Sequence, residues 1–506
     1  MKKIKMVAVL AFLGVSLVYW GCGSPTEPTE EKTKPDDPVV VPPVCKGDSC
    51  DTIVTPPVCN PGDPCDTLVT PPKCKPGDPC DTTSGINTNG PGAWAPVWSC
   101  PSGVSAGGLK LDKDDLGVDS HYVVIKFKDG GTPEVTFSDN LYECNSNGSV
   151  GENVKINISY YYENGVPYNI IVSGTARNGS LLIKGEAKKT LYLNGANITN
   201  PTGPAINIQS NKRTDVHLVG SCERRNILTG RGNVTSSGAE QAKGAIFAEG
   251  TLVFGGTGTL EVRSTDKHAI VSDEFIEVDN GSIFIYESKG DGIHANERIT
   301  IKGGKLHIKC EGDAIQNERK TAGKDKTPCP ITIEGGDIKI RTTGPKGHGI
   351  VSDSSDVVIT GDATKIDITL TGDGSKGIRS HGNVKISGAT TYLEAHGARE
   401  SLSDDTSSAA GIKADGDVEI TRGILTVKST RANENGKGLN IDGNLKMSGG
   451  TVKITADGDG VRVRSSITIS GGYLESKSAH KSDIDCDGKL NQTGGTLIAE
   501  KIKKGS

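Results

Sequence analysis

Short runs in which apolar and polar residues alternate recur along the second half of the chain, with glycine between them. Residues 298–302 read Arg-Ile-Thr-Ile-Lys and residues 305–309 read Lys-Leu-His-Ile-Lys, and the same order returns at 330–334 and 337–341. Alternation with a period of two is typical of β-strands, and the glycine pairs at 303–304 and 335–336 indicate turns. A unit of such short strands cannot bury its apolar face alone, so neighbouring units must stack.

A small residue followed by an aliphatic residue marks most units. The pairs are Ala269-Ile270, Gly292-Ile293, Ala314-Ile315, Gly349-Ile350, Gly377-Ile378, Gly411-Ile412, Gly438-Leu439 and Gly460-Val461, and Ile484 continues the series. Compact units are 22 or 23 residues apart, and longer ones carry extra loop residues, as at 318–328 and 399–408. The pattern predicts an all-β solenoid, a three-sided parallel stack with coils of about 22 residues.

Composition agrees with this fold class and excludes several functions. The chain has 506 residues, of which 67 are glycine and 4% are aromatic, which suits a narrow solenoid core better than a sandwich or an α/β enzyme. The net charge of −5 indicates neither a nucleic-acid partner nor a purely electrostatic membrane partner. No Walker, Rossmann, zincin or nucleophile-elbow motif is present in the sequence.

The first 22 residues are typical of an export signal. Lys2, Lys3 and Lys5 precede an apolar stretch, residues 6–19, which is too short for a comfortable transmembrane span. Gly21-Cys22 lies where a bacterial lipoprotein signal places its lipid-accepting cysteine, although Tyr19 and Trp20 are bulky for that site. We expect an exported protein whose only membrane contact is a lipid on Cys22, in the cell envelope as an outer-membrane or surface lipoprotein. Ordinary secretion is the alternative.

Residues 23–92 are rich in proline, threonine and aspartate, which is typical of a spacer. Three copies of a short repeat each hold two cysteines five or six positions apart. An exported chain favours disulfides, and we expect the pairs Cys45–Cys50, Cys59–Cys65 and Cys74–Cys80. A metal site is the less favoured alternative, because no histidine is nearby.

Residues 93–190 alternate as a β-rich lead-in, and a solenoid needs its open end covered. We therefore expect an N-terminal cap at 93–190 and the solenoid at 191–506. Cys310 and Cys329 flank the insertion at 318–328 and are expected to form a disulfide, whereas Cys222 and Cys486 are expected to be buried thiols.

The stretch from Leu191 to Asn200, with Gly203-Pro-Ala-Ile206 after it, resembles a bacterial cell-surface carbohydrate-binding family. Its representative is a clostridial protein that binds cellulose and acidic sugars. The resemblance covers about residues 120–500, and the Gly-Asp-Gly-Ile repeats add weaker support. It implies a right-handed parallel β-helix similar to calcium-dependent pectate lyases, with bound calcium and a polysaccharide ligand.

Stacking brings chosen residues into columns about 4.8 Å apart. Asp291 and Asp313 precede their aliphatic markers by two positions and should be neighbours. Two carboxylates that close repel each other unless a cation or protons lie between them, and hard oxygen ligands suit Ca²⁺. Asp266 and Asp273 are the further expected calcium ligands. The alternative is that these aspartates are turn residues whose side chains bond to local amides.

The third strand of each coil should present a flat outer face. Its outward residues combine aromatic rings with bases, which can stack on sugar rings and pair with sugar carboxylates. The expected ligand-binding residues are Phe284, Tyr286, Lys309, Lys339, Arg341 and Tyr392. A solvated sheet surface is the alternative for any single lysine.

These features predict non-catalytic binding of polysaccharide at the cell surface, to acidic pectin-type glycans, cellulose or both, by a monomer. A calcium-dependent polyuronate lyase is the first alternative, and Lys289 would then be the candidate base. A structural adhesin without sugar preference is the second.

Overall fold

The structure is a computed structural model that describes residues 121–138, 148–158, 167–220, 225–232, 242–318, 328–402, 405–430 and 435–505. The chain divides at Val97/Trp98, and the description concerns the second unit. The predicted signal, the lipidation site Cys22, the spacer and its disulfides (Cys45, Cys50, Cys59, Cys65, Cys74 and Cys80) lie outside the described residues, as do Cys100, Cys144 and Cys222. Where the chain is described, it holds no helix with the length and apolar character to cross a bilayer.

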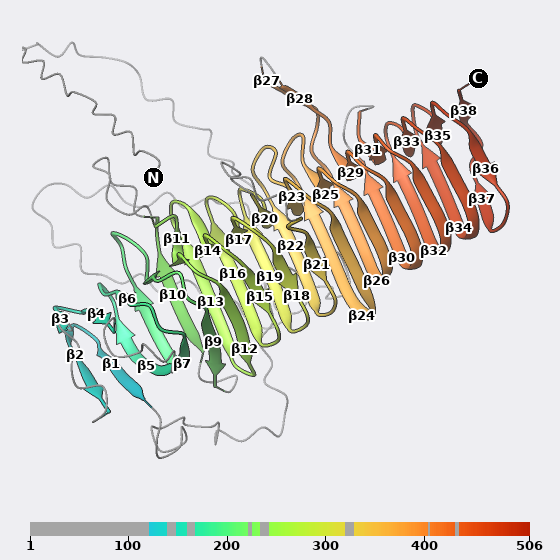
Figure 1. Cartoon of the computed structure of the whole chain (residues 1–506). Coiled ribbons are helices and arrows are strands. Elements are labelled where there is room, and N and C mark those ends of the chain that lie inside the picture. The colour runs from blue at the N-terminus through green and yellow to red at the C-terminus, as the bar shows by residue number, and fades with distance from the viewer. Residues whose placement is uncertain are drawn as a thin grey trace, which may run out of the picture. The chain divides into compact units, whose positions relative to one another are not determined.

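Two sheets run the length of this unit, and Figure 1 shows their strands side by side from β4 to β38. The 15-stranded sheet contains β3 (Gly148–Val150), β4 (Asn153–Asn157), β6 (Leu181–Lys184), β8 (Ile206–Gln209), β11 (Gly244–Ala248), β14 (His268–Ser272), β17 (Ile293–Ala295), β20 (Ile315–Asn317), β23 (Ile350–Ser352), β25 (Lys376–Ser380), β29 (Ala410–Ala414), β31 (Lys437–Ile441), β33 (Val461–Val463), β35 (Ile484–Cys486) and β38 (Ile502–Lys504).

The second sheet has 21 strands. They are β1 (Tyr122–Lys128), β2 (Gly131–Phe137), β5 (Tyr168–Ala176), β7 (Lys189–Thr199), β9 (Thr214–Val219), β10 (Asn226–Gly230), β12 (Leu252–Gly256), β13 (Thr259–Ser264), β15 (Ile276–Val278), β16 (Ser282–Ser288), β18 (Ile299–Ile301), β19 (Lys305–Cys310), β21 (Ile331–Ile333), β22 (Asp337–Thr342), β24 (Val357–Leu370), β26 (Val384–Ala395), β30 (Val418–Ser429), β32 (Leu445–Ala456), β34 (Ile467–Ser478), β36 (Leu490–Gln492) and β37 (Thr496–Ile498). A separate hairpin joins β27 (Glu400–Leu402) to β28 (Asp405–Ser407).

Successive coils stack in parallel and in register. Ile270 pairs with Ile293, which pairs with Ile315, and the same column continues without a break to Ile484. The predicted marker residues therefore form one column, and their side chains are buried in a single core of stacked aliphatic residues. This confirms the repeat and its compact spacing.

The all-β class is correct, but the predicted three-sided right-handed parallel β-helix is not what the structure shows. The strands form two long parallel sheets rather than three sides. The reason is β24, a single strand that pairs with both β21 and β22 and turns a corner at Gly361, whose φ is 82°. Strand pairing resumes after such corners with a shift in register, and the second and third runs of a coil therefore belong to one sheet.

Two antiparallel hairpins lie at the N-terminal edges of the sheets. β1 pairs with β2, and β3 pairs with β4, whereas β1–β5 and β4–β6 are already parallel pairs of the stack. The hairpins protect edges that would otherwise offer unpaired backbone groups. The boundary that the sequence placed between residues 190 and 191 lies inside β7.

One charged side chain lies inside the apolar stack. Lys189 is 1% exposed, and its Nζ donates to Ser210 Oγ at 2.8 Å. Burial lowers the pKa of Lys189 to about 8. The charged form of Lys189 is therefore less stable in the folded protein than in the unfolded chain, where the group keeps its ordinary pKa.

We expect stability to rise with pH as Lys189 is neutralised. Below pH 8, Lys189 is protonated in both the folded and the unfolded state, and the full free-energy cost of burying the charge lowers stability. Between pH 8 and about 10.5 the unfolded state binds more protons than the folded state, so stability rises with pH. Lys189→Met should stabilise the protein at pH 7 by about 1–3 kcal/mol, and the gain should vanish above pH 10. Thermal midpoints across pH test this, with the exposed neighbour Lys188→Met as the control. An equal gain in both variants would contradict it.

Candidate functional site

The third run of each coil builds an outward column along the 21-stranded sheet. Register places in it Phe284, His307, Lys339, Asp367, Tyr392, Thr426, Lys453 and Glu475. A second column lies two residues further along each strand and contains Lys309, Arg341, Thr369, Glu394, Lys428, Thr455 and Lys477. We call these two columns and the ring of Tyr473 beside them the outer face.

The outer face brings most of the predicted ligand-binding residues together. Lys339 and Tyr392 share the first column, and Lys309 pairs directly with Arg341 in the second. Tyr286 lies at a bulge of β16, where the register with β13 shifts, and its ring is 5.1 Å from the Arg263 guanidinium. These positions follow from strand alternation, which sends the intervening aliphatic residues into the core.

Phe284 does not lie open on this face. Its side chain is 3% exposed, with the Tyr286 ring stacked at 6.2 Å and the His307 ring edge-on at 5.1 Å. Burial lowers the pKa of His307 to about 4, so this imidazole is neutral near pH 7. Phe284 therefore supports the rings above it and is not itself available for stacking on a sugar.

A Tyr-Leu-Glu sequence occurs twice on the outer face with the same geometry. Tyr392 donates to Glu394 Oε2 at 3.0 Å, and the Lys428 ammonium lies 5.3 Å from its ring centre. Tyr473 donates to the glutamate two residues on at 2.9 Å, and the Lys453 ammonium lies 5.9 Å from its ring centre. Each ring is thus held by its hydroxyl and flanked by a cation.

Acidic side chains interrupt the bases of the outer face. Asp367 separates Lys339 from Tyr392 in the first column, and Glu475 follows Lys453. Burial raises the pKa of Asp367, with Glu394 adding to the rise. The face is therefore mixed in charge, unlike a continuous basic track for a polyanion.

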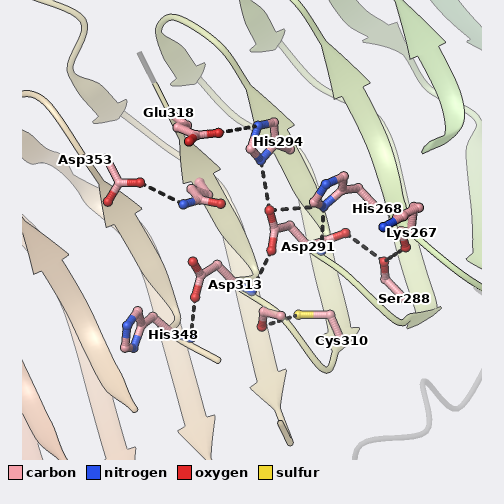
Figure 2. A network of polar contacts seen from close by, with 12 residues as sticks. Lys267, His268, Ser288, Asp291, His294, Cys310, Asp313, Glu318, His348 and Asp353 are labelled. Atoms are coloured by element: carbon pink, nitrogen blue, oxygen red, sulfur yellow. Dashed lines mark hydrogen bonds and ion pairs between the residues drawn. The ribbon is translucent and has the colours of Figure 1, made fainter. Parts of the chain in front are cut away.

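A column of polar side chains runs along one corner of the 15-stranded sheet, and each one accepts a hydrogen bond from the backbone of the next coil. His268 Nδ1 accepts from the Asp291 amide at 2.9 Å, and Asp291 Oδ1 accepts from the Asp313 amide at 2.9 Å. Asp313 Oδ1 accepts from the His348 amide at 2.6 Å, and His348 Nδ1 accepts from the Lys376 amide at 2.9 Å. Figure 2 shows the middle of this ladder.

Asp291 and Asp313 are neighbours one coil apart, as predicted, and they differ in protonation. Burial would raise the pKa of Asp291, but contacts with the imidazoles of His268 and His294 outweigh it and hold that pKa below its ordinary value. Burial raises the pKa of Asp313 to about 8, and the Asp291 carboxylate adds to the rise. The pair therefore carries one negative charge near neutral pH, and a proton on Asp313 relieves the repulsion.

The other two predicted calcium ligands have different partners. Asp266 is 3.0 Å from Arg231 Nη2 in an exposed ion pair, and Asp273 accepts from Asn296 Nδ2 at 2.8 Å. Neither belongs to the group that surrounds Asp291. The residues near Asp291 supply nitrogen as well as oxygen, which is not the oxygen shell that Ca²⁺ prefers.

His294 is the neighbour of Asp291 that sequence reasoning missed. Its Nδ1 lies 2.8 Å from Asp291 Oδ2, and His268 Nδ1 lies 3.1 Å from the same oxygen. The two imidazole rings stack at 4.7 Å. The sequence position of His294 could have indicated this contact. His294 follows its marker residue Ile293 by one position, so its side chain points out of the core, toward the turn that carries Asp291. His268, Asp291 and His294 form what we call the His–Asp cluster, the one group of three such ligands among the described residues.

Lys289 lies in an exposed ion pair with Glu311. The hydrogen bond that the Lys289 ammonium donates to Glu311 raises the pKa of Lys289, and the carboxylate charge adds to the rise. A general base must be unprotonated at working pH, so this environment disfavours Lys289 in that role.

The prediction of a Cys310–Cys329 disulfide is wrong. Cys310 is a buried free thiol in the structure. Its Sγ lies 3.3 Å from the Gly312 carbonyl, and burial raises the pKa of the thiol well above its usual range. The described residues on either side of the insertion are joined by a hydrogen bond that the Asn317 amide donates to the Cys329 carbonyl. Cys486 is a buried thiol, as predicted.

The chain is similar in sequence to one protein family and in structure to one solved protein named below. Residues 152–436, more than half of the chain, match the model of a family described as "Carbohydrate-binding domain-containing protein". No curated protein matches. Among solved structures, the chain is similar to a polysaccharide lyase-like protein from C. thermocellum, with 20% identity over 60% of this chain and 96% of that chain and a TM-score of 0.41.

Proposed function

Because the chain belongs to the family of carbohydrate-binding domain-containing proteins, we propose that its outer face binds a polysaccharide without cleaving it. The polymer lies along the stack, across successive coils. One sugar ring stacks on Tyr392, and the bases around it bond to hydroxyl or carboxylate oxygens. The expected ligands remain acidic pectin-type glycans and cellulose, and the expected setting is the cell surface of an exported, lipid-anchored protein.

The observation that carries this proposal is the repeated pair of braced tyrosines in one in-register face. A hydroxyl fixed on Glu394 and a cation beside the ring reduce the freedom of Tyr392 before any ligand arrives. Between Tyr392 and Tyr473 lie Thr426 and Lys453 of the first column and, in the adjacent column that contains Tyr473, Thr451 and Ile424, which is 48% exposed. An apolar side chain between two rings suits the face of a sugar polymer better than it suits water.

We expect Tyr392→Ala to weaken polysaccharide binding about tenfold, which corresponds to about 1.4 kcal/mol. Tyr392→Ala/Tyr473→Ala should weaken it further, because both rings contact the same polymer. Retention on immobilised cellulose and polygalacturonate, converted to affinities, measures the effect. Salt dependence separates the two ligands, since only the polyanion should lose affinity as salt rises.

Tyr192→Ala is the matched control. Tyr192 is also an outward tyrosine beside another ring, but it lies in β7 on the second run of its coil, where it pairs with His217. Equal losses in Tyr192→Ala and Tyr392→Ala would contradict the proposed face. If the protein releases an unsaturated sugar product that absorbs in the ultraviolet, the proposal of binding without cleavage is wrong and the lyase alternative is favoured. A parallel experiment with Ca²⁺ and then a chelator tests the predicted calcium.

A further inference from the structure

We propose that the His–Asp cluster binds a divalent transition metal ion of the zinc type. The three ligand atoms, two imidazole nitrogens and one carboxylate oxygen, all lie within 4.8 Å of one another. Asp291 Oδ2 is 3.1 Å from His268 Nδ1 and 2.8 Å from His294 Nδ1. Tetrahedral Zn²⁺ with bonds of about 2.0–2.2 Å needs its ligands roughly 3.3–3.6 Å apart, so the two histidine–carboxylate distances would have to lengthen by less than an ångström.

The fold positions these three ligands independently of any ion. His268 begins β14, Asp291 stands opposite it one coil later, and His294 lies in the centre of β17. Pairing of Ile270 with Ile293 fixes the distance between the two backbones that carry the histidines. Figure 2 shows both imidazoles directed at one carboxylate oxygen.

The donor set distinguishes between metal classes. Imidazole nitrogen with one carboxylate is the ligand set of zinc and other first-row transition metals, often with three protein ligands and an open fourth position. Ca²⁺ takes six to eight oxygens, which the cluster cannot supply. The cluster therefore departs from the calcium that the resemblance implies.

Neighbouring groups hold the ligands in place. Asp291 Oδ1 accepts the Asp313 amide at 2.9 Å, which turns Oδ2 toward the imidazoles. Ser288 Oγ donates to the Asp291 carbonyl at 2.7 Å. On the far side of His294, Nε2 lies 3.8 Å from Glu318 Oε2, so a carboxylate stands near the nitrogen through which metal-bound imidazoles are often oriented, although beyond hydrogen-bond distance.

A cation could bind between His268 Nδ1 and Asp291 Oδ2, which are close together without a hydrogen bond between them. His268 Nδ1 accepts the Asp291 amide proton at 2.9 Å and also lies 3.1 Å from Asp291 Oδ2, to which it cannot donate at the same time. A metal would take the lone pair of this nitrogen in place of the amide. The His268 side chain is 21% exposed, so an ion can reach the site from solvent. The cluster lies on the 15-stranded sheet and the outer face on the other, so this inference does not rest on the proposed sugar binding.

The test is titration of chelator-stripped full-length protein with Zn²⁺ against a colorimetric chelator, followed by Co²⁺ as a visible probe. Wild type should bind one more ion than His294→Gln or Asp291→Asn, and that ion should give the visible bands of low-coordinate Co²⁺ without a sulfur charge-transfer band. Absence of that band separates the cluster from the cysteines of the spacer. Ca²⁺ in excess should not displace Zn²⁺.

His217→Gln is the control, because His217 is an outward histidine that stands beside Tyr192 and outside the cluster. It should retain wild-type stoichiometry, and circular dichroism should show that all variants are folded. Equal stoichiometry in wild type and in both cluster variants would overturn the proposal, and so would displacement of Zn²⁺ by Ca²⁺. Loss of sugar binding in Tyr392→Ala with unchanged Zn²⁺ binding would show that the two sites are separate.

Discussion

Replacing Asn226 with leucine is expected to lower the free energy of unfolding by about 4 kcal/mol or more. Asn226 is fully buried and bonds to four backbone groups. Its Oδ1 accepts from the amides of Gly195 at 2.8 Å and Ala196 at 3.0 Å. Its Nδ2 donates to the carbonyls of Val219 at 3.3 Å and Thr259 at 3.0 Å. Leucine has a similar volume but leaves all four groups unsatisfied, at about 1–3 kcal/mol each before relaxation.

Hydrogen exchange gives the sharpest readout of Asn226→Leu. Amides at 195 and 196 should lose protection first, since they lose their acceptor, and the thermal midpoint should fall as well. Asn491→Leu is the control, because Asn491 is exposed on β36 and should tolerate leucine. Retained protection at 195 and 196 would show that water or backbone movement replaces Asn226.

The second large effect is expected at a glycine corner. Gly423 has φ of 98°, a conformation that L-residues rarely adopt. A Cβ atom there would collide with the carbonyl oxygen of Gly388 in the preceding coil. Gly423→Val should therefore cost more than about 4 kcal/mol or prevent folding, because strain and collision add. Gly423→Ala should lose most of the same stability, since the collision begins at Cβ.

Thr421→Val is the control for this corner, because it introduces the same side chain two residues earlier on the same strand, at an exposed position. Its thermal midpoint should stay within a few degrees of wild type. If Gly423→Ala unfolds at the wild-type temperature, the corner does not require glycine, and the continuity of hydrogen bonding around it has another cause.

Much of the fold could be predicted because the stack repeats local rules. The marker at Ile293 and the alternation in residues 305–309 each depend on burial of one face of a strand, which the sequence displays directly. The number of sheets could not be predicted. Whether the second and third runs remain hydrogen-bonded through Gly361 depends on backbone angles at one corner, and glycine marks a corner without fixing those angles.

For the candidate sites, the sequence could predict which residues are neighbours in the stack but not how their side chains are oriented or protonated. Alternation placed Lys339 and Tyr392 in one column, but the cover that His307 and Tyr286 form over Phe284 depends on rotamers. Proximity of Asp291 and Asp313 followed from spacing. Their unequal protonation did not, because it arises from two histidines that reach the turn from different coils.

Because the coils stack in register, the length of the chain can change during evolution by the gain or loss of whole coils. Ile293 and Ile315 occupy the same position in coils 22 residues apart, and each coil pairs only with the coils on either side. Gain or loss of such a unit, by unequal recombination between neighbouring repeats of the gene, leaves every other coil with the neighbours it needs. The exceptions are the stretches where a side chain accepts a hydrogen bond from the backbone of the next coil, as from His268 to Lys376 and from Asp356 to Ser466. Descendants of this protein can therefore gain or lose coils most readily outside those stretches.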